Sequence, residues 1–186
     1  MAMDLIFWII GGLAAVVLAW LLLTYNGFIT LRMRGRNALS QIDVQLKKRN
    51  DLVPNLVATV KGYAKHEKTL FENVTKARAA MANAGTLSEK AKASNMLTNT
   101  IKSLFAVAEN YPALQANQNF LKLQEELADL EEKIAYSRSF YNDVAQMYNT
   151  KLEVVPDSLV GNGFGFKALE FFQTGEKERG VPKVEF

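Results

Sequence analysis

The sequence predicts an all-α protein in which an N-terminal transmembrane helix is followed by an antiparallel up-down helical bundle with long helices. Three observations support this: an uncharged run from Leu5 to Leu23, apolar residues that recur every seventh position over long stretches, and only 4 prolines in 186 residues. A seven-residue apolar repeat is typical of helices that bury one stripe in a bundle or coiled coil. We therefore expect one membrane anchor and one bundle.

Residues 1–31 form the predicted anchor. The run LIFWIIGGLAAVVLAWLLL at 5–23 would rise by ~29 Å as a helix, which matches the hydrocarbon thickness of a bilayer. The alternative is a cleaved signal peptide, which needs a basic flank before the apolar run. Here that flank carries Asp4 and no lysine or arginine, and Trp8 and Trp20 lie near the two ends of the run, where amphipathic aromatics favour the lipid boundary. A retained helix is the prediction.

Basic residues follow the anchor and predict its orientation. Arg32, Arg34 and Arg36 stand just after it, and the cytoplasmic side of a membrane segment usually carries the excess of arginine and lysine. The bundle is therefore predicted to be cytoplasmic, with the N-terminus outside. The same three arginines are the expected contacts to anionic lipid headgroups. Nucleic-acid binding is not expected, because no recognition pattern accompanies the basic residues.

Residues 32–155 are predicted to contain three main helices, at about 37–84, 86–110 and 117–155. Between Leu39 and Met81, eleven of thirteen heptad positions are apolar, with Glu67 and Arg49 as the exceptions. An interior proline removes a backbone donor, so Pro54 predicts a break or kink near residues 50–54.

The second and third helices have clear start signals or a clear repeat. Thr86 and Glu89 have the spacing of a capping box, and Tyr111-Pro112 ends that helix. In 117–155, nine of eleven heptad positions are apolar. Short connections imply antiparallel neighbours. A polar cluster is expected to fix their register by facing Asn55, and its members are Asn117, Gln118, Asn119 and Gln124.

Residues 156–186 differ from the bundle. A Gly-rich turn at 161–165 is followed by FGFKALEFF at 164–172, which predicts a short aromatic fourth helix. Its phenylalanines are expected to close the end of the bundle; the alternative is that they lie against the membrane surface. The tail from Gln173 to Phe186 is polar and is predicted to be disordered.

The composition excludes many kinds of chemistry. There is no cysteine and one histidine, His66, so thiol nucleophiles, disulfides and multi-histidine metal sites within the chain are excluded. No G-x-S-x-G or S-x-x-K motif supports serine catalysis, and GNGFGFK lacks the Gly-Lys-Ser/Thr ending of a phosphate loop. We predict no catalytic, cofactor-binding or metal-binding residues, no cofactor and no small-molecule substrate. The protein is expected not to be an enzyme.

Several segments together resemble the LemA family of bacterial membrane proteins. They are SQIDVQLKKRNDLVPNLVATVKGYAKHE at 40–67, FENVTKARAA at 71–80, the block at 106–150 and FGF at 164–166. The resemblance implies a single-pass protein with a helical bundle in the bacterial inner (cytoplasmic) membrane. It implies no enzymatic activity and no catalytic residues. One departure is Leu39, where relatives often carry tryptophan.

The predicted function is that of a non-enzymatic, membrane-anchored scaffold that self-assembles at the inner membrane. An anchor confines all copies to one plane and raises their effective concentration, so a homo-oligomer is the expected state. The candidate contact residues are Leu52, Leu123, Phe171 and Phe172. The alternative is an adaptor that binds a membrane protease or another envelope quality-control protein.

Overall fold

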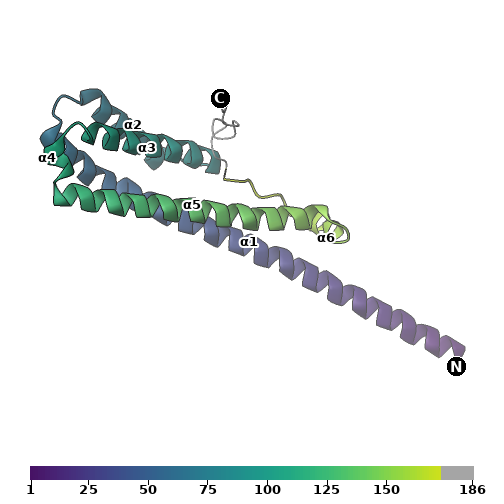
Figure 1. Ribbon diagram of the computed structural model, residues 1–186. Helices are drawn as coiled ribbons and strands as arrows, with labels where there is room; N and C mark the ends of the chain where they lie inside the picture. The colour runs from purple at the N-terminus through teal and green to yellow at the C-terminus, as the bar shows by residue number, and fades with distance from the viewer. Residues whose placement is uncertain (173–186) are drawn as a thin grey trace, which may run out of the picture. The chain divides into compact units, whose positions relative to one another are not determined.

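The computed structural model describes residues 1–172, which contain six helices and no strand (Figure 1). The helices are α1 (Ala2–Tyr63), α2 (Lys68–Asn83), α3 (Leu87–Ala108), α4 (Pro112–Gln115), α5 (Gln118–Glu153) and α6 (Asp157–Gly163). The predicted all-α class is confirmed. The tail predicted to be disordered, from residue 173 onward, lies outside the described residues.

The chain divides into two compact units. The first unit combines residues 1–39 with residues 140–171, and the second combines residues 40–139 with Phe172. Both α1 and α5 contribute to each unit, because each of these helices is long.

The second unit is a helical bundle made by the C-terminal part of α1, by α2, α3 and α4, and by the first half of α5. In this unit, α2 and α3 pack against each other as a pair (Figure 1). Its core follows the predicted heptads, since most heptad positions of α1 and α5 are buried. The buried core residues are Val53, Leu56, Val60, Ala64, Val74, Ala77, Leu97, Ile101, Leu104, Ala108, Leu114, Phe120 and Leu127.

The break expected near residues 50–54 is absent, because α1 continues through Pro54 to Tyr63. A proline inside a helix leaves the carbonyl four residues earlier without its usual donor. That carbonyl belongs to Asn50, and the Nε of Arg78 on α2 donates to it at 3.2 Å. A side chain from a neighbouring helix therefore supplies the hydrogen bond that Pro54 cannot make.

The predicted helix 37–84 is interrupted elsewhere, at residues 64–67, between α1 and α2. Gly62, which has a low helix propensity, lies one residue before the end of α1. Ala64 in the connection is 0% exposed, so the turn itself packs into the core. The chain can then reverse, which sets α2 against the same core as the end of α1.

The capping box at the start of α3 is confirmed. The Thr86 hydroxyl accepts from the backbone N–H of Glu89 at 3.2 Å, and the Glu89 carboxylate accepts from the N–H groups of Thr86 and Gly85, both at 2.9 Å. These hydrogen bonds favour the ionised form, so they lower the pKa of Glu89 below its ordinary value.

The predicted polar cluster at the start of α5 is wrong. Gln118, Asn119 and Gln124 are exposed, as is Asn55. Asn117 makes other contacts: its Oδ1 accepts from the N–H of Phe120 at 3.0 Å, where α5 begins, and its Nδ2 donates to the Tyr63 hydroxyl at the end of α1 at 3.0 Å. Asn117 therefore satisfies one of the free N–H groups at the start of α5 and links this helix to the end of α1.

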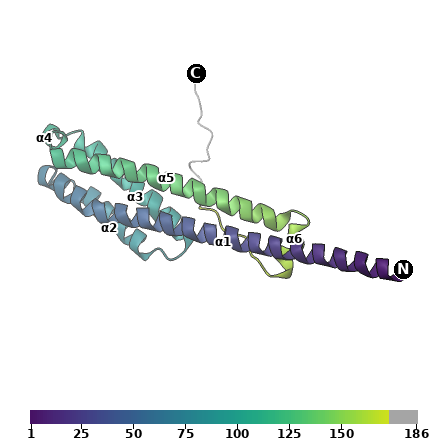
Figure 2. The ribbon, with the colours of Figure 1, turned by 90° about the horizontal axis from the view of Figure 1, so that it is seen from below.

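The first unit contains the N-terminal part of α1, the last part of α5, α6 and an extended segment. A methyl group added at Gly35 would meet Val144, Phe28 stacks edge-on against Tyr148, and Gly27 faces Lys151. The two helices therefore run antiparallel. Figure 2 shows α6 beside α1, where Gly161 leaves room for Phe28 and Leu152.

The aromatic fourth helix predicted within 164–172 is not formed; the short helix is α6, which precedes it. Gly165 has a φ of 70°, and its N–H donates to Asn162 while that of Phe166 donates to Gly161. This is a Schellman ending, which needs a residue that tolerates positive φ. A glycine in this position stops the helix before the phenylalanines.

Residues 166–170 are extended, and side chains of α5 bind their backbone. The Asn149 amide accepts from the N–H of Leu169 at 2.8 Å and donates to its carbonyl at 2.9 Å. The Tyr141 hydroxyl donates to the carbonyl of Glu170 at 2.6 Å, and burial raises the pKa of that tyrosine. Polar side chains thus satisfy backbone groups that a helix would have paired internally.

Candidate functional site

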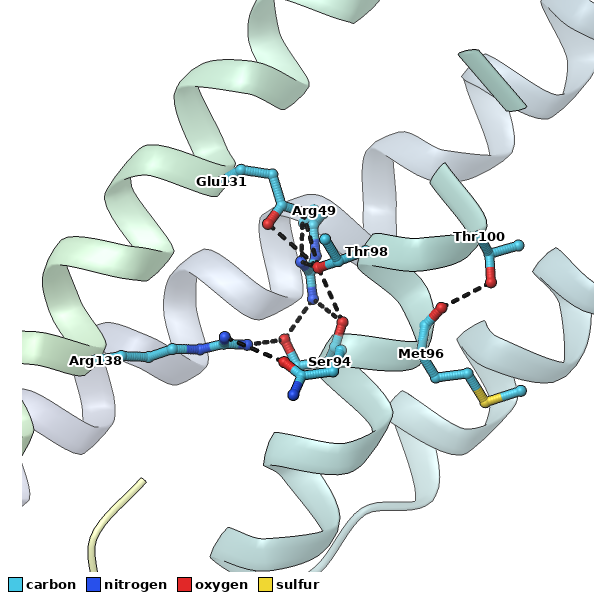
Figure 3. Close-up of polar contacts among 8 residues, drawn as sticks. Arg49, Ser94, Met96, Thr98, Thr100, Glu131 and Arg138 are labelled. Atoms are coloured by element: carbon cyan, nitrogen blue, oxygen red, sulfur yellow. Dashed lines mark hydrogen bonds and ion pairs between the residues drawn. The ribbon is translucent and has the colours of Figure 1, made fainter. Parts of the chain in front are cut away.

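The polar side chains that converge in the second unit are arginines rather than a catalytic or metal-binding set. Among residues 1–172, no group of three or more His, Asp or Glu side chains is placed to hold a metal ion. Instead, five residues form what we call the Arg49 network: Arg49, Ser94, Thr98, Glu131 and Arg138 (Figure 3). They come from α1, α3 and α5.

Arg49 lies at the centre of this network and is 0% exposed. Its Nη1 donates to Glu131 Oε1 at 2.5 Å and to the Thr98 hydroxyl at 2.7 Å. Its Nη2 donates to the hydroxyl of Ser94 at 2.6 Å and to the Ser94 carbonyl at 3.2 Å. A planar guanidinium can bridge two helices in this way because its donors have fixed directions.

Arg138 approaches the same serine from α5. One Nη donates to the Ser94 hydroxyl and the other to Asn95 Oδ1 at 3.3 Å (Figure 3). Its guanidinium also lies 4.8 Å from the centre of the Phe172 ring. Ser94 is therefore the meeting point of two arginines, and it is 0% exposed.

This arrangement supports a structural role. The hydroxyls of Ser94 and Thr98 and the carboxylate of Glu131 all accept from the Arg49 guanidinium, which thereby joins α1 to α3 and α5, although the buried Nε of Arg49 has no hydrogen-bond partner among the described residues. A buried ion pair of this kind adds little net stability, but it favours one register, because any slip of α1 along α5 would separate Arg49 from Glu131. Sequence reasoning missed the network. The available signal was the position of Arg49 in a heptad line between Ile42 and Leu56, where a buried residue is expected.

One predicted contact residue, Leu52, lines a groove of about 440 Å³ in the second unit. Leu52 and Leu130 are its apolar residues, and charged side chains surround them. We call it the Leu52 groove. Its charged residues are Lys48 and Asp51 on α1 and Glu126, Asp129 and Lys133 on α5.

The other predicted contact residues do not gather around this groove. Leu123 is half-buried and packs on the core of the bundle. Phe171 belongs to the first unit and is 45% exposed. Phe172 is 2% exposed under Arg138, so it is a packing residue here and presents no surface to a partner.

The three arginines predicted to contact lipid headgroups differ in their surroundings. Arg34 and Arg36 are exposed. Arg32 is half-buried, and its guanidinium lies 5.4 Å from the centre of the Phe166 ring. Two of the three are thus free to meet a surface, whereas Arg32 also stabilises the extended segment.

The N-terminal part of α1 is long and apolar enough to cross a membrane. Its most apolar window of 18 residues has a mean hydropathy of 2.6 and is 0% buried. In water, so large an exposed apolar surface would be strongly unfavourable. The described residues thus combine one apolar N-terminal helix with an α-helical bundle.

Comparison with known proteins agrees with this class. The LemA family model matches residues 38–186, and the chain belongs to the LemA family. Among curated proteins it is similar to the magnetosome proteins MamQ 2 and MamQ 1 of Paramagnetospirillum magneticum, each 27% identical over 84% of this chain and 67% of the relative. It is also similar to the magnetosome protein MamQ of Magnetospirillum gryphiswaldense, at 25% identity over 82% of this chain and 65% of the relative. The chain thus spans about two thirds of the length of these relatives.

Proposed function

We propose that this protein is a non-enzymatic, membrane-anchored scaffold that self-assembles at the bacterial inner membrane, with the bundle on the cytoplasmic side. The observation that carries the proposal is the Leu52 groove, whose rim has charges of both signs. Confinement of all copies to one bilayer by α1 supports it, because a weak contact then acts at a high effective concentration.

The rim charges favour a second copy of this chain as the occupant of the groove. The α1 side carries Lys48 and the α5 side carries Asp129, both exposed. In a two-fold symmetric pair, the same surface meets itself. Lys48 of each copy would lie opposite Asp129 of the other, while Leu52 and Leu130 supply apolar contact.

A charge-exchange experiment tests this arrangement. Full-length protein in nanodiscs or mild detergent is measured by light scattering as wild type, Lys48→Glu, Asp129→Lys, and a mixture of the two variants. In a pair of identical single variants, both contacts between positions 48 and 129 join like charges. Self-association of each single variant should therefore weaken about tenfold. The mixture should regain association, because every pair then has opposite signs.

A matched control is Lys102→Glu, which reverses an exposed charge on α3 outside the groove and should leave the mass unchanged. A monomeric wild type at all concentrations would overturn the scaffold proposal. So would a wild type that stays small and co-purifies with a distinct membrane protein, which is the result expected of an adaptor.

A further inference from the structure

We infer that residues 154–164, which comprise α6 and the residues on either side of it and which we call the α5–α6 turn, form a second membrane-contacting element that inserts apolar side chains into the lipid interface beside the anchor. The inference rests on the membrane anchoring proposed above. It concerns a surface of the first unit that the predicted contact residues do not include.

Four large apolar side chains are exposed within this short turn. Val155 is 79% exposed, Leu159 68%, Phe164 62% and Val154 46%. Single exposed apolar residues are ordinary on protein surfaces, whereas a continuous group of them marks an interaction site. Val155 also continues the heptad line of α5, but it lies after the end of that helix at Glu153. It is therefore exposed at a position where the heptad pattern predicts a buried residue.

The turn lies beside the end of the predicted membrane span. Because α1 and α5 run antiparallel, with Gly27 facing Lys151, the end of α5 at Glu153 comes level with Tyr25 of α1, and the residues that follow come level with residues 22–24. The Thr24 hydroxyl donates to Asp157 at 3.4 Å, and the rings of Tyr25 and Phe164 are 5.0 Å apart. Contacts of Asp157 and Phe164, which lie on either side of Leu159 in the chain, therefore fix the position of the turn along α1.

Lipid, rather than a protein, is the occupant that fits this surface. The neighbouring α1 residues Leu22 and Leu23 are 56% and 73% exposed and close the apolar run. Exposed apolar side chains at the same level along α1 would meet the same lipid. Trp20 and Tyr25 pack against the core of the first unit, which includes Val160 of α6. Tryptophan and tyrosine are the residue types that favour the lipid–water boundary.

The charges of the turn are arranged to suit an interfacial depth. Asp157 forms an ion pair with Lys151, and the two side chains are 22% and 23% exposed. The Lys151 ammonium also lies 5.2 Å from the centre of the Phe28 ring. The charges of Lys151 and Asp157 therefore neutralise each other beside α1, while Leu159 stays exposed. Interfacial segments separate polar and apolar faces in the same way.

The experiment uses single cysteines, since the chain has none of its own. Leu159→Cys in the full-length protein is labelled with the fluorophore NBD and reconstituted into phosphatidylcholine–phosphatidylglycerol vesicles. Its emission should be blue-shifted and should fall about twofold when doxyl-labelled lipids are included, because an interfacial side chain lies 5–10 Å into the headgroup and acyl boundary.

Two further sites separate the possible outcomes. Val16→Cys lies within the predicted span and reports on the anchor, and Lys122→Cys lies on an exposed face of the bundle. Quenching at Val16 without quenching at Leu159 would overturn this inference and leave the anchor intact. No quenching at Val16 would overturn the anchor itself. Blue-shifted emission at Leu159 that lipids do not quench would identify a protein contact and also overturn it.

Discussion

At the residue scale, the buried Arg49 is the feature that most distinguishes this bundle from a purely apolar one. Removing its side chain would leave Glu131 without its cation and would take away one of the two guanidinium donors to the Ser94 hydroxyl. The Glu131 side chain is 33% exposed, so water can compensate it only in part. The loss of unfolding free energy should therefore exceed the loss caused by removing one partner of a surface ion pair.

We predict that Arg49→Met lowers the free energy of unfolding by about 3 kcal/mol. Thermal unfolding of the full-length protein in detergent, followed by circular dichroism, measures the effect. In the Glu131→Gln background, the same change should cost at least about 1 kcal/mol less, because the partner charge is already gone.

The control pair is Lys90 and Asp43, which join α3 and α1 at 2.7 Å with side chains 27% and 49% exposed. Lys90→Met should cost less than about 1 kcal/mol, as exposed ion pairs do. If Arg49→Met and Lys90→Met lowered the free energy of unfolding equally, burial of Arg49 would not be the reason for its larger predicted effect.

At the element scale, the continuity of α1 depends on a partner from α2. Pro54 leaves the Asn50 carbonyl without its helical donor, and Arg78 supplies the missing hydrogen bond. A helix interrupted by proline in the sequence can thus remain a helix in the fold when a neighbouring element satisfies the free group.

This pairing predicts a conditional effect. Arg78→Met should lower the free energy of unfolding by about 1 kcal/mol, the usual value of a hydrogen bond. In the Pro54→Ala background the loss should be smaller, since the N–H of the new alanine can donate to Asn50. The difference is measured from the melting temperatures with and without Arg78, determined once with proline and once with alanine at position 54.

The exposed Lys76→Met on α2 is the matched control and should change stability by less than about 0.5 kcal/mol. If Arg78→Met costs the same with proline or alanine at position 54, the side chain acts through packing rather than through the Asn50 carbonyl.

At the scale of the whole molecule, the charge that follows the anchor predicts the topology. Arg32, Arg34 and Arg36 should keep the bundle in the cytoplasm. In intact bacterial cells, Lys122→Cys should therefore resist a membrane-impermeant maleimide until the cells are permeabilised, whereas Met3→Cys should react at once. The reverse pattern would show the bundle on the outer side.

The sequence alone was sufficient to predict the all-α class, the apolar N-terminal helix and most of the core. These features follow from periodicity and local signals, as with the Thr86–Glu89 capping box and the buried heptad residues Leu46 and Tyr148. Each depends on residues close in the chain or on one helical face, so the pattern is visible without a fold.

Only the tertiary structure decided the features that depend on residues far apart in the chain. The donor for Asn50 comes from Arg78, the partner of Arg49 is Glu131, and Asn149 binds the backbone of Leu169. The exposure of Leu159 beside α1 likewise depends on the tertiary structure. A hydrogen bond or a buried surface exists only when two segments meet, and their meeting depends on packing of the whole chain rather than on any local pattern.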